Sequence, residues 1–141
     1  MDSSSLSSRS GQGTLEFVFV LLALFAGIFF LADVVKIGYC WGGVQYATSR
    51  GIRTIKMLPN ETPANVKEAN IKNEILRMTG ILGIALNLGD IAVQVTDDSI
   101  TVETAKRIVL SRLSAILISF GGDRSGSYDV RVKEVVRNES L

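Results

Sequence analysis

The chain has 141 residues, a formal net charge of +1 and 47% apolar residues, enough for one small domain with a modest core. Its 15 basic residues are balanced by 14 acidic ones without any basic cluster, so the charge pattern argues against a nucleic-acid partner. The sequence has no histidine and a single cysteine, Cys40, which argues against a bound metal and an internal disulfide, and we expect no cofactor.

A polar leader precedes a long apolar run. Residues 1–10, MDSSSLSSRS, have no apolar face to bury, so we expect them to be flexible. From Phe17 to Val35 the only charged residue is Asp33. At a rise of about 1.5 Å per residue, this run crosses most of a hydrocarbon layer of about 30 Å. It is longer than the apolar part of a secretory signal peptide, and no small-residue cleavage site follows it. The sequence therefore predicts a transmembrane helix over residues 17–35 that stays with the mature protein.

The helix is expected to continue beyond the membrane. No proline occurs between residues 11 and 58, so we predict one helix over residues 12–58, of which residues 36–58 form a stalk. The stalk contains glycines that weaken it, namely Gly42, Gly43 and Gly51. It begins with aromatic residues that suit the headgroup layer of a membrane, namely Tyr39, Trp41 and Tyr46. Two prolines then mark a linker over residues 59–63.

Residues 64–141 are predicted to form a small globular domain of the α+β class with a short antiparallel sheet. Apolar residues at helical spacing predict one helix over residues 64–88, ended by Gly89, and an amphipathic helix over residues 104–120. Alternating apolar residues predict strands over residues 90–95, 99–103 and 128–136.

The sequence shows no catalytic constellation. Carboxylates gather near one turn, but Asp97, Asp98 and Glu103 lack the spacing of an EF-hand calcium loop, so solvated turn residues are the better interpretation. The serines have no histidine and no GxSxG or SxxK motif to activate them. We therefore expect that this chain is not an enzyme.

The head of the apolar run carries a specific pattern. Gly11 and Gln12 lie shortly before the pair Glu16 and Phe17, with which the run begins. This pattern resembles the class III signal of type IV prepilins. In that family a membrane peptidase cuts after the glycine on the cytoplasmic side and leaves the apolar helix on the mature subunit. A glycine at the cut lets an enzyme approach the backbone closely. The resemblance implies that residues 1–11 are a leader that is removed.

Cleavage would free an α-amino group at Gln12, about one helical turn before Glu16. In apolar surroundings a carboxylate is tolerated when it meets a positive charge. The resemblance implies that Glu16 meets the free amine of a neighbouring subunit and sets the axial register of a fibre. The residue alone leaves an alternative, in which Glu16 lies among lipid headgroups at the edge of the apolar run.

The stretch Tyr39 to Ile55 extends the likeness, with its aromatic start, its small residues and Arg50-Gly51-Ile52-Arg53 near its end. Over residues 1–56 the chain resembles the TadE-like family of minor pilins, or pseudopilins, from tight-adherence (Tad/Flp) pilus systems. The major pilins of that system are usually much shorter, so a length of 141 residues favours a minor subunit. A major pilin that forms the fibre shaft is the alternative within the family.

The resemblance implies a structural or assembly subunit that supports pilus biogenesis, surface adhesion or secretion. Its implied partners are a prepilin peptidase, other pilin or pseudopilin subunits, the assembly platform of the pilus in the membrane, and the lipid bilayer. Its implied location is the cytoplasmic (inner) membrane, spanned once with the leader inside and the globular domain outside, and then the pilus or cell surface. The alternative is an unprocessed single-pass membrane protein whose outer domain binds a protein partner.

Three glycines are candidates for close helix packing. Gly38 and Gly42 have the spacing that lets two helices approach, and Gly27 lies inside the apolar run. Helix flexibility, or the ordinary tolerance of membrane helices for glycine, is the alternative. We expect Cys40 to be a small buried apolar residue, with lipidation or a bridge between subunits as alternatives.

The cleavage signal makes a direct prediction. The mature protein from its native membrane should begin at Gln12 in mass spectrometry. Gly11→Leu should accumulate as a longer, membrane-retained form, because its side chain obstructs the peptidase. Recovery of residues 1–11 from cells with functional pili, or normal processing of the variant, would contradict the site.

Overall fold

The computed structural model describes residues 5–55, 57–59, 61–96, 98–111 and 127–137, and for residues 5–12 the backbone alone. The described elements are, in chain order, helix α1 (Ser5–Ile55), helix α2 (Ala64–Ile81), the short 3-10 helix η1 (Leu88–Asp90), and strands β1 (Ile91–Val95), β2 (Ser99–Val109) and β3 (Ser127–Arg137). They belong to two compact units. The first contains α1 up to Val35 together with Leu110 and Ser111, and the second runs from Lys36 to Val109 and from Ser127 onward.

Helix α1 begins earlier than expected. It starts at Ser5, so residues 5–10, which we expected to be flexible, are helical. No proline interrupts this stretch, and a helix that is already nucleated extends by one hydrogen bond for each residue that it orders. A helical backbone neither supports nor contradicts the removal of residues 1–11, because it concerns the conformation of the chain and not its processing. The cleavage therefore stays a prediction.

The second unit contains a three-stranded antiparallel sheet in the order β1-β2-β3. Ile91 of β1 pairs with Thr104 of β2, which in turn pairs with Val132 of β3. The predicted strands over residues 90–95, 99–103 and 128–136 are all present, and Val130 and Val132 lie on the buried side as their spacing predicted. A long apolar helix followed by a small domain with a helix and an antiparallel sheet confirms the α+β class.

The predicted helix over residues 104–120 is wrong where the structure describes it. Strand β2 continues through Val109 and pairs with β3 along its whole length. Thr104 and Ile108 are buried whereas Arg107 and Val109 are exposed, which follows the alternation of a strand. The partner strand supplies hydrogen bonds that the local pattern cannot reveal, and this overrides the helical spacing of the apolar residues. Residues 112–120 of the predicted helix lie outside the described residues.

Helix α2 ends before the predicted position at Gly89. Its last residue is Ile81, and Gly83 adopts a left-handed φ of 69°, which glycine accepts without steric cost. The amide of Ile84 donates to the carbonyl of Thr79 at 2.8 Å, and the amide of Gly83 donates to the carbonyl of Gly80 at 3.1 Å. This pair of bonds is the Schellman motif, which satisfies the last carbonyls of a helix.

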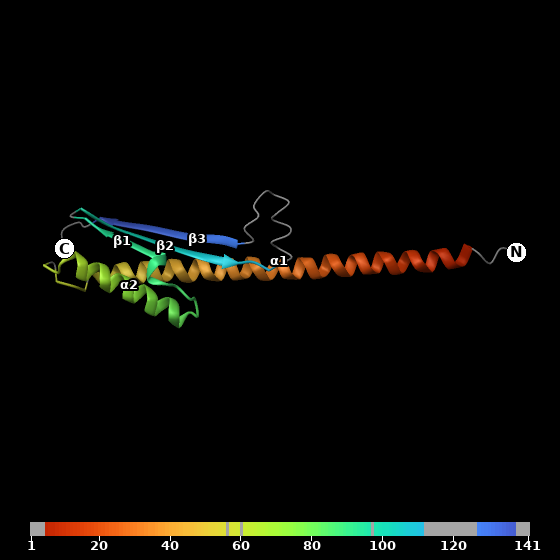
Figure 1. Ribbon diagram of the computed structural model, residues 1–141, viewed down its shortest axis with the longest axis horizontal. Coiled ribbons are helices and arrows are strands. Elements are labelled where there is room, and N and C mark those ends of the chain that lie inside the picture. The colour runs from red at the N-terminus through yellow and green to blue at the C-terminus, as the bar shows by residue number, and fades with distance from the viewer. Residues whose placement is uncertain (1–4, 56, 60, 97, 112–126, 138–141) are drawn as a thin grey trace. The chain divides into compact units, whose positions relative to one another are not determined.

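The second half of α1 is a core helix of the second unit. Figure 1 shows the three strands along one side of this part of α1 and α2 along another side. The side chains that α1 buries there recur at helical spacing, and they are Cys40, Val44, Ala47, Ile52 and Ile55. The last three of them share one core cluster with residues of α2 and the sheet, such as Ile71, Ile75 and Val102, whereas the first two share a second cluster with residues such as Ile84, Ile108 and Val130. Residues 36–55, expected to form a stalk, therefore stabilise the domain itself.

One buried polar contact joins α1 to the sheet. The hydroxyl of Thr48 donates to the carbonyl of Val44 at 2.8 Å and lies 3.1 Å from the hydroxyl of Thr104 on β2. Both threonines are fully buried, so each hydroxyl needs a partner inside the protein. Nearby, the hydroxyl of Ser49 donates to Glu134 of β3 at 2.8 Å. These bonds fix how α1 is rotated against the sheet.

Two glycines of α1 mark its closest packing. A Cβ at Gly51 would lie 2.7 Å from Cγ1 of Ile75 and 3.3 Å from the carbonyl oxygen of Ile71, both on α2. A Cβ at Gly43 would collide with Cδ1 of Ile84. The sequence identified these glycines only as weak points of the helix. The structure shows that Gly51 permits the close approach of α1 and α2.

Gly51→Ala therefore tests this packing. Alanine favours a helix over glycine by about 1 kcal/mol, but overpacking a core costs about 1–3 kcal/mol. We expect a net loss of stability in thermal unfolding of the detergent-solubilised chain, and a larger loss for Gly51→Val. Gly42→Ala is the matched control, because a Cβ there meets nothing within 4 Å, so the propensity gain should raise the stability. A stabilising Gly51→Ala would contradict the close packing.

Candidate assembly and membrane site

The first half of α1 presents an apolar surface around its whole circumference. We call residues 15–35 the apolar segment. Its large side chains are exposed, and they are Leu15, Phe17, Val18, Phe19, Val20, Leu21, Leu22, Leu24, Phe25, Ile28, Phe29, Phe30, Leu31, Val34 and Val35. Soluble monomers rarely expose an apolar patch of more than a few hundred square ångströms. Within the described residues, α1 is the one helix long and apolar enough to cross a membrane.

Glu16 and Phe17 both lie exposed at the head of the apolar segment. Gly11 and Gln12 belong to the same helix, and their side chains are not among those described. Because the backbone is helical from Gln12 to Glu16, the two residues lie one turn apart on one side of α1. An amino group created at Gln12 would thus lie within reach of the carboxylate on the same helix and, in an assembly, of one on a neighbouring helix.

Small residues share the face of α1 that carries Glu16. Ala23 and Gly27 follow Glu16 at positions i+7 and i+11, which return to the same side of a helix. A Cβ added at Gly27, Gly38 or Gly42 would meet nothing within 4 Å. Among the described residues, no neighbour therefore packs closely on these three glycines where a Cβ would stand. The packing role predicted for them requires a helix of another chain and stays a prediction.

Asp33, the second carboxylate of the apolar segment, has partners within the chain. Its side chain is only 7% exposed. Its Oδ2 atom accepts a hydrogen bond from the hydroxyl of Ser111 at 2.7 Å and another from the amide of Ser111 at 3.0 Å. Hydrogen bonds to a charged acceptor are the stronger kind, and they offset the loss of water around the carboxylate. No local pattern predicts this contact, because Ser111 follows Asp33 by 78 residues.

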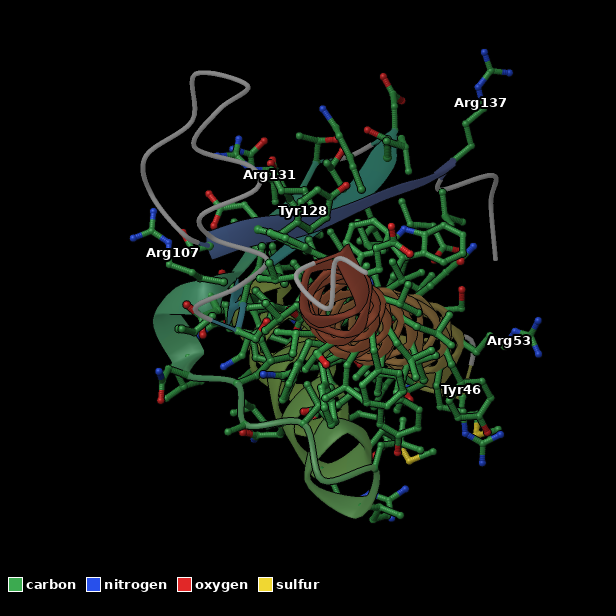
Figure 2. All side chains as sticks on the ribbon, turned by 90° about the vertical axis from the view of Figure 1, so that its right-hand side faces the viewer. Tyr46, Arg53, Arg107, Tyr128, Arg131 and Arg137 are labelled. Carbon is green, nitrogen blue, oxygen red and sulfur yellow. The ribbon has the colours of Figure 1, made fainter. Side chains whose placement is uncertain are left out.

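Aromatic and basic side chains project from α1 just after the apolar segment. Tyr39, Trp41 and Tyr46 are all exposed, and the hydroxyl of Tyr39 donates to the carbonyl of Leu82 at 2.7 Å. Figure 2 shows Tyr46 and Arg53 projecting outward from α1. Rings with a polar tip suit the boundary between hydrocarbon and water. The expected role of these aromatics at a membrane surface is compatible with their exposure.

The described part of the chain contains no group of three His, Cys, Asp or Glu side chains that could hold a metal ion. Cys40 is buried at the start of the second unit, where it packs with Val44 and Ile108. It thus takes the place of a small apolar core residue, and its burial gives no support to lipidation or to a bridge between subunits.

Asp33 provides a test of the first unit. Asp33→Ala should lower the free energy of unfolding by about 1–3 kcal/mol, because the amide and hydroxyl of Ser111 lose their acceptor. Asp33→Asn should lose less, since its carbonyl oxygen still accepts. Thermal unfolding in detergent measures both variants, with Asp98→Ala in an exposed turn as the control. Unchanged stability of Asp33→Ala would show that the contact with Ser111 contributes nothing.

Comparison of the chain with protein-family models, with curated proteins and with solved structures finds no match.

Proposed function

We propose that this chain is a pilin-like assembly subunit, held in the cytoplasmic membrane by the apolar segment and incorporated through Glu16 into a type IV pilus of the Tad/Flp type. It acts as a minor pilin or pseudopilin that supports pilus biogenesis, surface adhesion or secretion. The observation that carries the proposal is an apolar helix, exposed on all sides, with a single carboxylate at its head.

The apolar segment needs a cover. Leaving one large apolar side chain in water costs about 1.5–3 kcal/mol relative to burying it, and this segment exposes such side chains on every face. A bilayer covers the segment before assembly. In a fibre, the same segments of neighbouring subunits cover one another. A pilin uses one helix for both states, because the same apolar surface fits lipid and protein.

Glu16 gives the assembly its register. Within a bundle of apolar helices, a carboxylate without a partner is strongly unfavourable, so each subunit prefers the position in which Glu16 meets a positive charge. The amine that cleavage creates at Gln12 supplies this charge. The small residues Ala23 and Gly27 on the face of Glu16 let neighbouring helices approach closely. Together these features favour one axial offset between subunits over all others.

The second unit supplies a water-exposed head. The outer face of its sheet carries charged residues, with Glu103 opposite Lys133 and an ion pair of 3.2 Å between Arg107 and Asp129. Figure 2 shows Arg107 and Arg131 projecting outward from the sheet. A face of this kind suits water on the outer side of the membrane and not the hydrocarbon layer. It is the part of the subunit available for contacts that support adhesion or secretion.

Two alternatives make different predictions. An unprocessed single-pass protein whose outer domain binds a partner keeps its original Met1 terminus and has no need of a charge at Glu16. A major pilin of the fibre shaft is cut at the same bond but outnumbers every other subunit in purified fibres. The ratio of this chain to the most abundant fibre subunit distinguishes a major pilin from a minor one.

Replacement of Glu16 tests the proposal. Glu16→Ala should still be cut after Gly11 and inserted in the membrane, but its incorporation into sheared fibres should fall about tenfold or more, as expected for losing about 1.4 kcal/mol or more of pairing energy. Glu16→Asp should retain part of the incorporation. Immunoblots of membrane and fibre fractions measure both. Glu61→Ala removes an exposed carboxylate outside α1 and should assemble normally. Full incorporation of Glu16→Ala would overturn the assigned role.

A further inference from the structure

A partly open cavity of about 340 Å³ lies in the second unit, where the first residues of that unit on α1 meet β2 and the segment after α2. Three cationic side chains line it, namely Lys36, Lys106 and Arg107. No carboxylate is among the described residues of its lining. Its size is at the lower end of the range for pockets that bind small molecules.

Neither lysine forms an ion pair with another residue that the structure describes. Lys36 donates to the carbonyl of Val109 at 3.0 Å, and Lys106 donates to the carbonyl of Ala85. A carbonyl orients an ammonium group but does not neutralise it, and each ammonium has three donors. Arg107 differs, because its guanidinium pairs with Asp129 at 3.2 Å. Lys36 and Lys106 therefore provide the positive potential, and Arg107 extends it at the exposed rim.

The remaining walls of the cavity are apolar. Ile84 and Ile108 are buried at its base and belong to the core cluster that also contains Cys40. Val109 is exposed at its edge. A simple inorganic anion is strongly hydrated and gains nothing from such walls. A ligand with an anionic head and an aliphatic continuation matches both parts of the lining.

The place of the cavity along the chain indicates the source of such a ligand. Lys36 directly follows the apolar segment on the same helix, and Tyr39 of the lining is one of the exposed aromatics that suit the headgroup layer. Lysine side chains at this depth attract anionic lipid headgroups. We infer that the cavity binds the phosphate headgroup of an anionic membrane phospholipid, with the start of an acyl chain against Ile84 and Ile108.

This inference rests on the membrane insertion in the proposed function, but not on cleavage or fibre assembly. A bound lipid would cover the apolar part of the cavity lining. The absence of a carboxylate in the described lining favours an anionic lipid over a zwitterionic one, whose ammonium group would face the lysines.

The test is native mass spectrometry of the full chain in a neutral detergent with phosphatidylglycerol, phosphatidylcholine or inorganic phosphate. We expect one bound phosphatidylglycerol and weaker binding of the other two by about tenfold or more. The double variant Lys36→Gln/Lys106→Gln should weaken phosphatidylglycerol binding by about tenfold or more, as expected for losing a hydrogen bond to a charged group. Ala85→Phe should block the cavity while both lysines remain.

The matched control is Arg131→Gln/Lys133→Gln, which removes two exposed cations from the outer sheet face, away from the cavity lining, and should bind as the wild type does. Equal binding of both lipids would show that the lysines do not select an anionic ligand, and an equal loss in the control would reduce the effect to general charge attraction. Either result would overturn the site. Phosphate that binds as tightly as phosphatidylglycerol would overturn the lipid in favour of a free anion. Glu16→Ala should bind lipid normally, so a failure of assembly is separable from a failure of this site.

Discussion

An apolar surface that surrounds a helix cannot stay in water, and this constraint governs the whole molecule. Residues 15–35 expose bulky apolar side chains on every face, so lipid or other helices must cover them. For the same reason, each charged residue in this segment raises the question of which group offsets its charge. Asp33 is satisfied inside the chain by the amide and hydroxyl of Ser111. Glu16 forms no ion pair with another described residue.

Helix α1 contains both the apolar segment and a core helix of the second unit, because the pattern of its apolar residues changes near residue 36. Over the apolar segment, residues 15–35, α1 exposes apolar side chains on all sides, as lipid or a bundle requires. Beyond it, α1 buries one stripe that includes Val44, Ala47 and Ile55, and its other faces are exposed or polar. The stripe packs on α2 and the sheet, with Gly51 permitting close approach to α2 and Thr48 joined to Thr104. No separate stalk is present in the described residues, because the helix that leaves the apolar segment is already the core of the second unit.

The sequence predicted those features that depend on one period or one type of residue. The apolar run and the alternation in β1 and β3 each have a local pattern, and the structure confirms them. Residues 104–109 carry apolar residues that fit a helix and a strand equally well, and only pairing with β3 decides between the two. The end of α2 was misplaced because the apolar residues continue beyond Gly83, whose left-handed backbone the pattern does not reveal. Contacts between distant segments, such as Asp33 with Ser111 or Gly51 with α2, have no local signature at all.

The continuity of α1 through residues 35 and 36 has a consequence for proteolysis of the chain. Proteases cut accessible backbone that is not held in regular structure, such as exposed loop tips and poorly ordered termini. Here every peptide bond between the apolar segment and the core is helical. The head should therefore resist shedding by soluble proteases for as long as its core stays folded, and its release should require unfolding of the domain itself.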